Sequence, residues 1–250
     1  MADDEKIYEI KLNLNDKKRI FPYTTNDNLN NLRITNVALY STTPPEQSKY
    51  VCKIIRKYFN NKQLKNMTLT DVGGCIGGNT YYLSNCFEKI NFIENLSIHV
   101  DIFKNNLNIV FPNKNNINII QENYLDVYKK IQQDVIFMDP PWFGIDYYKQ
   151  KSIELYYPSN GKKILLHNLV KKLSKLTSMI IIKLPINYNI EEKLFKNSKF
   201  EFNTIVPVVQ YNNKIIYNLV FLSHIIPKYK INYERKFDSL GYNYMRWYKI

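Results

Sequence analysis

The sequence predicts an α/β fold with a mostly parallel sheet, helices on both faces and an antiparallel hairpin near the C-terminus. Three observations lead to this fold class. A cluster of glycines follows a short apolar strand at residues 67–70. From there on, strand-like and helix-like segments alternate, as in parallel sheets whose strands are joined by helices. Two β-rich runs, 204–210 and 214–222, flank the turn sequence Tyr-Asn-Asn and predict the hairpin.

The N-terminal part carries one strong helix signal. Residues 8–14 alternate between apolar and polar and predict a strand, whereas the Asn-rich stretch up to about residue 36 predicts loop or short helix. Thr43, Pro44 and Glu46 predict the start of a helix. In this interpretation Thr43 is the N-cap, Pro44 takes the first helical position and Glu46 closes a capping box.

The later elements follow from apolar periodicity. We expect strands at 67–70, 96–101, 117–120, 135–138 and 179–182, and helices from residue 79, near 105–110 and at 162–176. There are no internal repeats and no clear interdomain linker. We therefore expect an N-terminal extension at 1–36, one main domain at 37–225, and a basic, aromatic C-terminal tail at 226–250.

The charge of the chain indicates a polyanionic partner. Lys and Arg number 35 against 22 Asp and Glu, which gives a formal net charge of +13. Such an excess favours nucleic acid as the first candidate partner. A lysine-rich solvated surface is the alternative, because the abundance of Lys, Asn, Ile and Tyr would also follow from an AT-rich genome.

Cysteine and histidine usage supports neither a disulfide framework nor a metal site. Cys52, Cys75 and Cys86 are odd in number and lack C-x-x-C spacing. The three histidines are isolated from one another and are expected to be packed or surface residues. The acidic start, Met-Ala-Asp-Asp-Glu, is unlike a signal peptide, and no apolar run approaches membrane-spanning length. We expect an intracellular protein, cytoplasmic or nuclear, without membrane contact and of open oligomeric state.

A glycine-rich turn predicts a cofactor site. Four of the 7 glycines lie within residues 71–80, between a strand and a helix start. Such a turn lets a ligand approach the backbone closely. Asp101 ends the predicted strand 96–101, where a carboxylate can accept both ribose hydroxyls of an adenosine. Cys75 stands where a dinucleotide fingerprint needs its second glycine. This departure favours S-adenosylmethionine, which has no phosphate, over a nicotinamide cofactor.

A second motif, Asp139-Pro140-Pro141-Trp142, follows the apolar run 135–138. Its residue types suit the methylation of an exocyclic amine. The Asp139 carboxylate and the Pro140 carbonyl can accept the two amine protons, and the prolines hold both acceptors in place. Trp142 offers a flat face on which a base can stack. The alternative is a rigid turn followed by a core tryptophan.

With these motifs in this order, the chain resembles the cap-specific guanine-N2 methyltransferases, the trimethylguanosine synthase family. The resemblance rests on segments 40–46, 71–80, 139–147 and 184–187, and it covers about residues 37–225. It implies a Rossmann-like class I methyltransferase with a seven-stranded sheet. It also implies S-adenosyl-L-methionine as cofactor and methylation of N2 on the guanine of m7G-capped RNA.

The resemblance implies three groups of site residues. Asp139 and Pro140 are the candidate catalytic pair. The candidate substrate-binding residues are Trp142, Tyr147, Lys183 and Asn187. The candidate cofactor-binding residues are Thr43, Asp71, Gly73, Gly77, Gly78, Asn79, Thr80, Asp101, Asn123 and Tyr124.

Several positions depart from the family pattern. Asp139 replaces a serine, Cys75 a loop glycine, and Phe143 a glycine beside the stacking tryptophan. Asn123 replaces an aspartate that contacts the adenine amine, a bond that an amide oxygen can also accept. Ile186 replaces an arginine suited to cap phosphate, a role that Lys183 or another lysine would have to take.

Two other functions remain open from the sequence. The first keeps the chemistry and changes the substrate to guanine N2 or adenine N6 in ribosomal RNA, transfer RNA or DNA. Adenine methylases usually place D-P-P-W before the cofactor glycines, opposite to the order here. The second is a catalytically silent methyltransferase fold that serves as an RNA-binding subunit, which Cys75 and Ile186 leave open.

Overall fold

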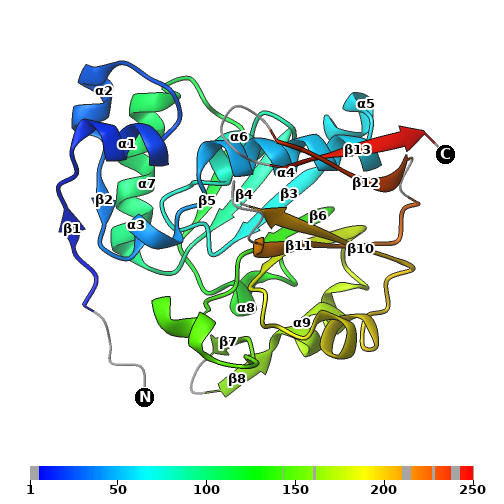
Figure 1. The fold of residues 1–250 in the computed structure, drawn as a ribbon. Helices are drawn as coiled ribbons and strands as arrows, with labels where there is room; N and C mark the ends of the chain where they lie inside the picture. Colours follow the sequence, from blue (N-terminus) through cyan, green and yellow to red (C-terminus); the bar gives the residue numbers. More distant parts are fainter. Residues whose placement is uncertain are drawn as a thin grey trace. The chain divides into compact units, whose positions relative to one another are not determined.

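A seven-stranded sheet forms the centre of the fold, with the strand order β10-β11-β9-β6-β3-β4-β5 (Figure 1). The computed structural model describes residues 6–142, 144–159, 162–209, 215–226, 229–237 and 243–249. The seven strands are β3 (Thr68–Val72), β4 (Lys89–Ile93), β5 (Ile117–Ile120), β6 (Val135–Met138), β9 (Met179–Leu184), β10 (Phe202–Val209) and β11 (Ile215–Ser223). The predicted fold class, mostly parallel with an antiparallel pair near the C-terminus, is confirmed.

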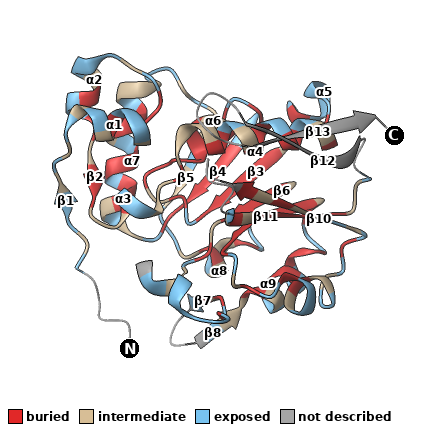
Figure 2. Ribbon diagram, viewed as in Figure 1, coloured by how far each residue is buried: buried red, intermediate tan, exposed pale blue. Residues whose placement is uncertain are grey.

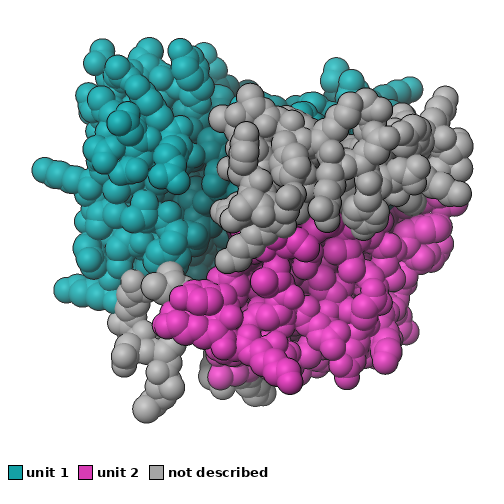
Figure 3. Space-filling model, in the orientation of Figure 1, with its two compact units in different colours: residues 1–133 teal, residues 134–250 magenta. Residues whose placement is uncertain are grey.

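The chain divides into two compact units, residues 1–133 and 134–250 (Figure 3). In the first unit β3, β4 and β5 run parallel, and all five residues of β3 are buried (Figure 2). In the second unit β6 is parallel to β9, while β11 is antiparallel to both β9 and β10. Continuous apolar sequence in β6 and in residues 179–182 of β9 suits strands that are buried on both faces.

The first unit contains most of the helices. They are α1 (Leu14–Ile20), α2 (Asn26–Asn31), α3 (Ala38–Ser41), α4 (Pro45–Tyr58), α5 (Asn61–Leu64), α6 (Thr80–Leu83), α7 (Ser97–Val110) and α8 (Tyr124–Val127). A short antiparallel pair, β1 (Glu9–Ile10) and β2 (Ile34–Thr35), lies beside α7 in Figure 1. The side chain of Asn106 on α7 bonds to both the N–H and the C=O of Arg33, at 2.9 and 2.8 Å. These bonds join residues 6–36 to α7.

The second unit adds shorter elements around its four sheet strands. They are η1 (Ile145–Lys149), β7 (Tyr156–Ser159), β8 (Lys162–Leu165), α9 (Leu166–Leu173), η2 (Glu191–Phe195), β12 (Tyr229–Phe237) and β13 (Asn243–Lys249). The last two strands form a hairpin in the predicted tail. The tail's basic side chains, and Phe143, lie outside the described residues. None of the described helices combines the length and apolar composition needed to span a membrane.

The strand predicted at 96–101 is wrong. Residues from Ser97 onward form α7, and the second strand of the sheet is β4, which the sequence interpretation missed. Val100, Phe103 and Leu107 recur at helical spacing and pack with Phe92 of β4 in one apolar cluster. The rings of Phe92 and Phe103 stack with centroids 3.9 Å apart. Burial of this helical stripe outweighs the weak strand-like alternation of the segment.

Three boundaries also differ from the prediction. Within 8–14 the strand includes only Glu9 and Ile10, because Asn13 caps the start of α1. The helix after Thr43 begins at Pro45, with Pro44 as an N-cap that makes no side-chain bond. The helix predicted at 162–176 begins four residues later, because 162–165 pair with β7 as the strand β8.

Candidate cofactor and acceptor sites

The glycine-rich loop after β3 has an unusual backbone. The N–H groups of Gly73 and Gly74 both donate to the carbonyl of Ile93 at the end of β4, at 2.9 and 3.0 Å. Gly73 and Gly77 have positive φ values of 72° and 92°, and Cys75 adopts φ 51°. Cys75 is thus a side-chain-bearing residue in the left-handed region, where glycine is favoured. The family glycine that it replaces fits this conformation.

The glycines also allow close packing of the protein against itself. A Cβ on Gly77 would lie 2.3 Å from the ring of Phe103, and one on Gly74 would lie 2.3 Å from the ring of Phe92. A Cβ on Gly78 would lie 2.9 Å from the carbonyl oxygen of Thr43. The absence of side chains in this loop therefore has an internal cause besides access for a ligand.

These contacts predict unequal effects of substitution. Gly77→Ala should lower the free energy of unfolding by about 2–5 kcal/mol, from a left-handed alanine plus overpacking. Gly144→Ala is the matched control, because Gly144 has φ 93° and no atom within 4 Å of an added Cβ. Gly144→Ala should cost about 1–3 kcal/mol, because φ 93° with ψ 176° is a backbone conformation that essentially only glycine adopts. Urea denaturation measures both, and equal effects would contradict the packing argument.

The acid that follows the second strand is Glu94. Its carboxylate accepts the backbone N–H of Cys75 at Oε2 and that of Leu96 at Oε1, both at 2.9 Å. The residue is 6% exposed. Asp101, predicted for this position, lies exposed on α7, so the strand-end argument for it is wrong. The separation of 19 residues between Cys75 and Glu94 is the signal that could have identified this acid, since such acids follow the glycine loop by about 20 residues.

His99 is a buried neighbour of Glu94. The ring is 3% exposed, its Nε2 lies 3.1 Å from Thr35 Oγ1, and its Nδ1 lies 3.9 Å from Glu94 Oε2. Burial lowers the pKa of His99, but the neighbouring Cys75 and Glu94 side chains outweigh this and raise it to about 10. The His99 ring therefore lies beside the Glu94 carboxylate. The sequence interpretation gave His99 no role in the site.

Other predicted cofactor residues bond to one another. Thr80 Oγ1 donates to the buried carboxylate of Asp71, which joins the start of α6 to β3. Asn79 donates to Thr43 Oγ1 and accepts from the Ser48 hydroxyl, both at 3.1 Å. These bonds fix the loop against the start of α4. The side chains of Thr43, Asn79 and Thr80, together with Asp71, thus stabilise the conformation of the loop.

The two predicted residues after β5 have local partners as well. Asn123 caps α8 by accepting the N–H of Leu125 at 2.9 Å. Tyr124 is buried, and its hydroxyl donates to Gln133 at 3.1 Å. Both side chains therefore stabilise the turn that follows β5.

In the second unit, the acceptor motif begins where β6 ends. Asp139 follows Met138, which pairs in parallel with Ile182 of β9, so the next residue on β9, Lys183, lies beside it. Lys183 Nζ donates to Asp139 Oδ2 at 2.8 Å, and the two side chains are 11% and 19% exposed. Burial raises the pKa of Asp139, opposed by the charge and hydrogen bond of Lys183. The ammonium thus helps to keep a poorly solvated carboxylate ionised.

Aromatic rings surround this ion pair. Lys183 Nζ lies 5.5 Å from the ring centre of Trp142 and 5.1 Å from that of Tyr217. Tyr147 packs edge-on against Trp142 with centroids 4.9 Å apart. The buried indole N–H of Trp142 has no hydrogen-bond partner among the described residues. The structure therefore brings together Asp139, Trp142, Tyr147 and Lys183, as well as Tyr217, which sequence reasoning missed.

Asn187 positions this group. Its Nδ2 donates to the backbone carbonyls of Tyr147 and Gln150, both at 2.8 Å. These bonds hold the 3₁₀ turn η1 that carries Tyr147. Ile186, which stands in place of the family arginine, is exposed.

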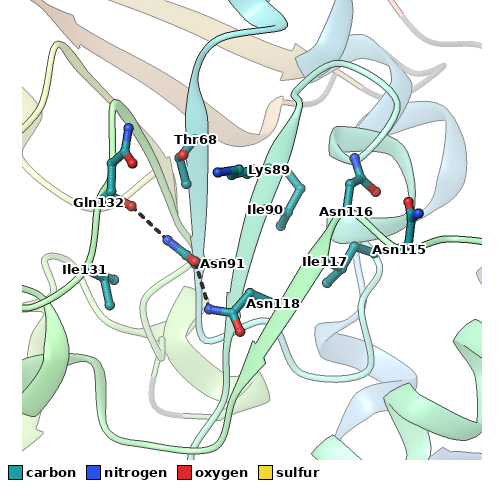
Figure 4. Close-up of a pocket in the computed structure, with 10 residues that line it drawn as sticks. All are labelled: Thr68, Lys89, Ile90, Asn91, Asn115, Asn116, Ile117, Asn118, Ile131 and Gln132. Carbon is teal, nitrogen blue, oxygen red and sulfur yellow. Dashed lines mark hydrogen bonds between the residues drawn. The ribbon is translucent and has the colours of Figure 1, made fainter.

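A cavity of about 520 Å³ lies elsewhere in the first unit (Figure 4). Its lining includes Thr68, Lys89 and Ile117, the first residues of β3, β4 and β5. The glycine loop and Glu94 follow the opposite ends of β3 and β4, so this cavity is separate from the candidate cofactor site. Among the described residues, no three His, Cys, Asp or Glu side chains gather as a metal site would need.

Comparison with known proteins defines the class. A family model described as RNA cap guanine-N2 methyltransferase matches residues 66–217, more than half of the chain. Together with the fold, this match identifies an S-adenosylmethionine-dependent methyltransferase of the Rossmann-like class. The chain belongs to the RNA cap guanine-N2 methyltransferase family.

Individual relatives are distant. The uncharacterized protein L320 of Acanthamoeba polyphaga mimivirus is 23% identical over 223 residues, 78% of this chain and 86% of that protein. A Porphyromonas gingivalis protein described as a methyltransferase has a TM-score of 0.57 at 15% identity, covering 86% of this chain. This chain spans 51% of that protein's length. The Thermus thermophilus 16S rRNA N2 G1207 methyltransferase, solved with AdoMet and guanosine, has a TM-score of 0.50 at 12% identity over 70% of this chain and 42% of its own. These two structures support the fold.

The first unit contains groups that fit S-adenosylmethionine. Glu94 is an acid directly after a parallel strand, and its carboxylate is held by two backbone N–H groups. A carboxylate in this place suits the vicinal hydroxyls of a ribose. The neighbouring loop has small residues and left-handed backbone, which lets a ligand approach closely.

Proposed function

We propose that this protein methylates the exocyclic N2 of guanine in RNA and that the acceptor is the 7-methylguanine of a cap. The observation that carries the proposal is the half-buried Asp139 carboxylate at the end of β6, flanked by Lys183 and the ring of Trp142. Membership of the cap guanine-N2 family supports the same substrate class.

The first unit would bind the cofactor. Glu94, in place of the predicted Asp101, accepts the ribose hydroxyls, and its fixed orientation lowers the entropic cost of binding. The loop 73–78 would contact the rest of the S-adenosylmethionine molecule through its backbone, and Asn123 would lie near the adenine. When bound, S-adenosylmethionine supplies an electrophilic methyl group.

The second unit would orient the acceptor amine. The amine's two N–H groups donate to Asp139 and to the carbonyl of Pro140, which leaves the nitrogen lone pair free for the methyl group. Asp139 Oδ2 is paired with Lys183, so Oδ1 is the oxygen left for the amine. Pro140 and Pro141 restrict the backbone that carries both acceptors. The nitrogen becomes acidic once methylated, so water can take its proton and no general base is required.

Trp142 would hold the base. Lys183 Nζ already lies near the faces of Trp142 and Tyr217, so these rings form an environment that favours positive charge. A 7-methylguanine ring carries such a charge and would gain an electrostatic term absent for plain guanine. Tyr147 holds Trp142 in place from its edge.

Cap-analogue binding tests this step. The parent protein should bind m7GTP more tightly than GTP by roughly three- to thirtyfold, from a cation–π term of about 0.5–2 kcal/mol. Trp142→Leu should remove most of this preference and keep cofactor affinity, because leucine offers contact area without a ring quadrupole. Titrations of both nucleotides against both proteins measure it. A Trp142→Leu protein that keeps the full preference would refute the role of the ring.

One observation favours a second acceptor, a neutral guanine within ribosomal or transfer RNA. The ammonium of Lys183 repels a second cation at the same rings, unless it moves when the base binds. Lys183→Met separates the two cases, because it removes the charge and keeps most of the side-chain length. For a cap enzyme it should increase the m7GTP preference. Equal affinity of the parent for m7GTP and GTP would favour the neutral guanine.

A further inference from the structure

The cavity at the amino ends of β3, β4 and β5 has a lining built in advance of any ligand (Figure 4). Asn91 Nδ2 donates to the carbonyl of Gln132 at 2.9 Å, and Asn91 Oδ1 accepts from Asn118 at 3.2 Å. Asn116 Nδ2 donates to the carbonyls of Ser84 and Phe87, at 2.9 and 3.0 Å. This network fixes the wall that runs from β4 to β5.

The same wall presents unused polar groups. Asn116 Oδ1 is buried and has no hydrogen-bond partner within the described chain, although buried carbonyl oxygens nearly always have one. The side chains of Asn115 and Gln132 are exposed at the rim, and no bond to either is found among the described residues. The ligand should therefore offer both donors and acceptors.

The charge of the cavity is positive. Lys89 is exposed, and no described acidic side chain pairs with it. None of the ten described residues that line the cavity is Asp or Glu. In Figure 4 the Lys89 side chain extends from β4 towards Thr68 and Gln132. An anionic group on the ligand would find its partner here.

Ile117 and Ile131 add half-buried apolar surface to the lining. Apolar side chains, amides that both donate and accept, and an ammonium correspond to the face of a base, its polar edge and a phosphate. The volume of the cavity also suits a nucleotide, since small-ligand sites enclose about 300–1,000 Å³.

We propose that this cavity binds one nucleotide of the RNA substrate other than the methylated guanine. The base lies against Ile117 and Ile131, its polar edge bonds to the amides of Asn115 and Asn116, and the phosphate pairs with Lys89. That the nucleotide belongs to substrate RNA rests on the proposed function. The cavity's chemistry fits a free nucleotide equally, so the test includes both sources.

Lys89→Gln is the test variant, and Lys65→Gln is its control. Lys65 is an exposed lysine of the same unit that does not line the cavity, so both variants lose one charge. Lys89→Gln should weaken binding of a capped RNA of about 20 nucleotides by roughly three- to tenfold and reduce its salt slope by about 0.7. Lys65→Gln should change neither quantity by more than about twofold. Methylation of a cap dinucleotide should be unchanged in both variants.

Photocrosslinking gives an independent readout. RNA carrying 4-thiouridine should crosslink to peptides that contain residues 115–118 or 131–132, and Asn115→Ala should reduce the yield. Equal RNA affinity for Lys89→Gln and Lys65→Gln, without crosslinks in these peptides, would overturn the proposal. Binding of AMP or UMP that depends on Lys89, with RNA affinity unchanged, would assign the cavity to a free nucleotide and also overturn it. Failure of the proposed function would appear separately, as no methylation of any cap substrate.

Discussion

Asp139→Ala should reduce methyl transfer by at least about a hundredfold while leaving S-adenosylmethionine affinity unchanged. The substitution removes the acceptor that orients the amine, and loss of such alignment alone costs about two orders of magnitude. It also leaves Lys183 without its 2.8 Å partner, so an amine would meet an ammonium in place of a carboxylate. Single-turnover rates with labelled methyl donor, together with calorimetry of cofactor binding, measure both effects.

Asp146→Ala is the control for this experiment. Asp146 is an exposed carboxylate of the same unit and pairs with the exposed Lys149 on η1. Its removal should leave turnover within about twofold of the parent, since exposed ion pairs contribute little. If Asp139→Ala turns over at the parental rate, Asp139 is a turn residue and the amine is oriented by other groups.

Acidification should change turnover and stability in opposite directions through Asp139. Burial raises the folded-state pKa of Asp139 above its ordinary value of 3.8. Turnover should therefore fall with acidification at a higher pH than for a solvated aspartate. Stability changes in the other direction, because the folded state holds this proton more tightly than the unfolded chain. The free energy of unfolding should therefore fall as the pH rises from 3.8 to the folded pKa of Asp139. Asp139→Asn should abolish this fall, because asparagine does not ionise.

Glu94→Gln should weaken S-adenosylmethionine binding by roughly five- to a hundredfold, which corresponds to about 1–3 kcal/mol for charged hydrogen bonds to the ribose hydroxyls. Glutamine keeps one oxygen to accept an N–H from Cys75 or Leu96, so the fold should persist. Calorimetric titration measures the affinity, and the thermal unfolding midpoint checks the fold.

Asp101→Ala supplies the matched comparison for Glu94. Asp101 lies exposed on α7, seven residues further along the chain, so its removal should leave cofactor affinity unchanged. The opposite pattern, with weakened binding in Asp101→Ala and parental binding in Glu94→Gln, would restore the sequence-based assignment and refute the assignment to Glu94.

The sequence was most informative where local pattern and burial agree. Val135–Met138 and the stretch 179–182 are continuous apolar runs, and both form the predicted buried strands. The glycine loop was located because its left-handed backbone demands residues that are scarce elsewhere in the chain. Prediction failed where a distant partner decides the structure. Residues 97–101 are helical because the helix packs Phe103 on Phe92, and 162–165 form a strand because they pair with β7.

The residues of the candidate site also fall into those that a local motif reveals and those that only the register of the sheet brings together. Asp139 and Trp142 could be recognised as a contiguous motif, but the Lys183–Asp139 ion pair joins residues 44 positions apart. It arises from the parallel register of β6 and β9, which no local pattern encodes. The same holds for Tyr217, which reaches Lys183 from the antiparallel strand β11.

Cys75 shows that the glycine-rich loop admits a side chain at one of its left-handed positions. Its thiol lies 3.6 Å from the Ser41 hydroxyl, in space that the three neighbouring glycines do not have. A side chain is therefore tolerated at position 75. At Gly74, Gly77 and Gly78 a Cβ atom would collide with Phe92, Phe103 and Thr43, respectively. Motif searches that demand glycine at all four places would miss chains like this one. A pattern that keeps only the three sterically closed glycines would find them.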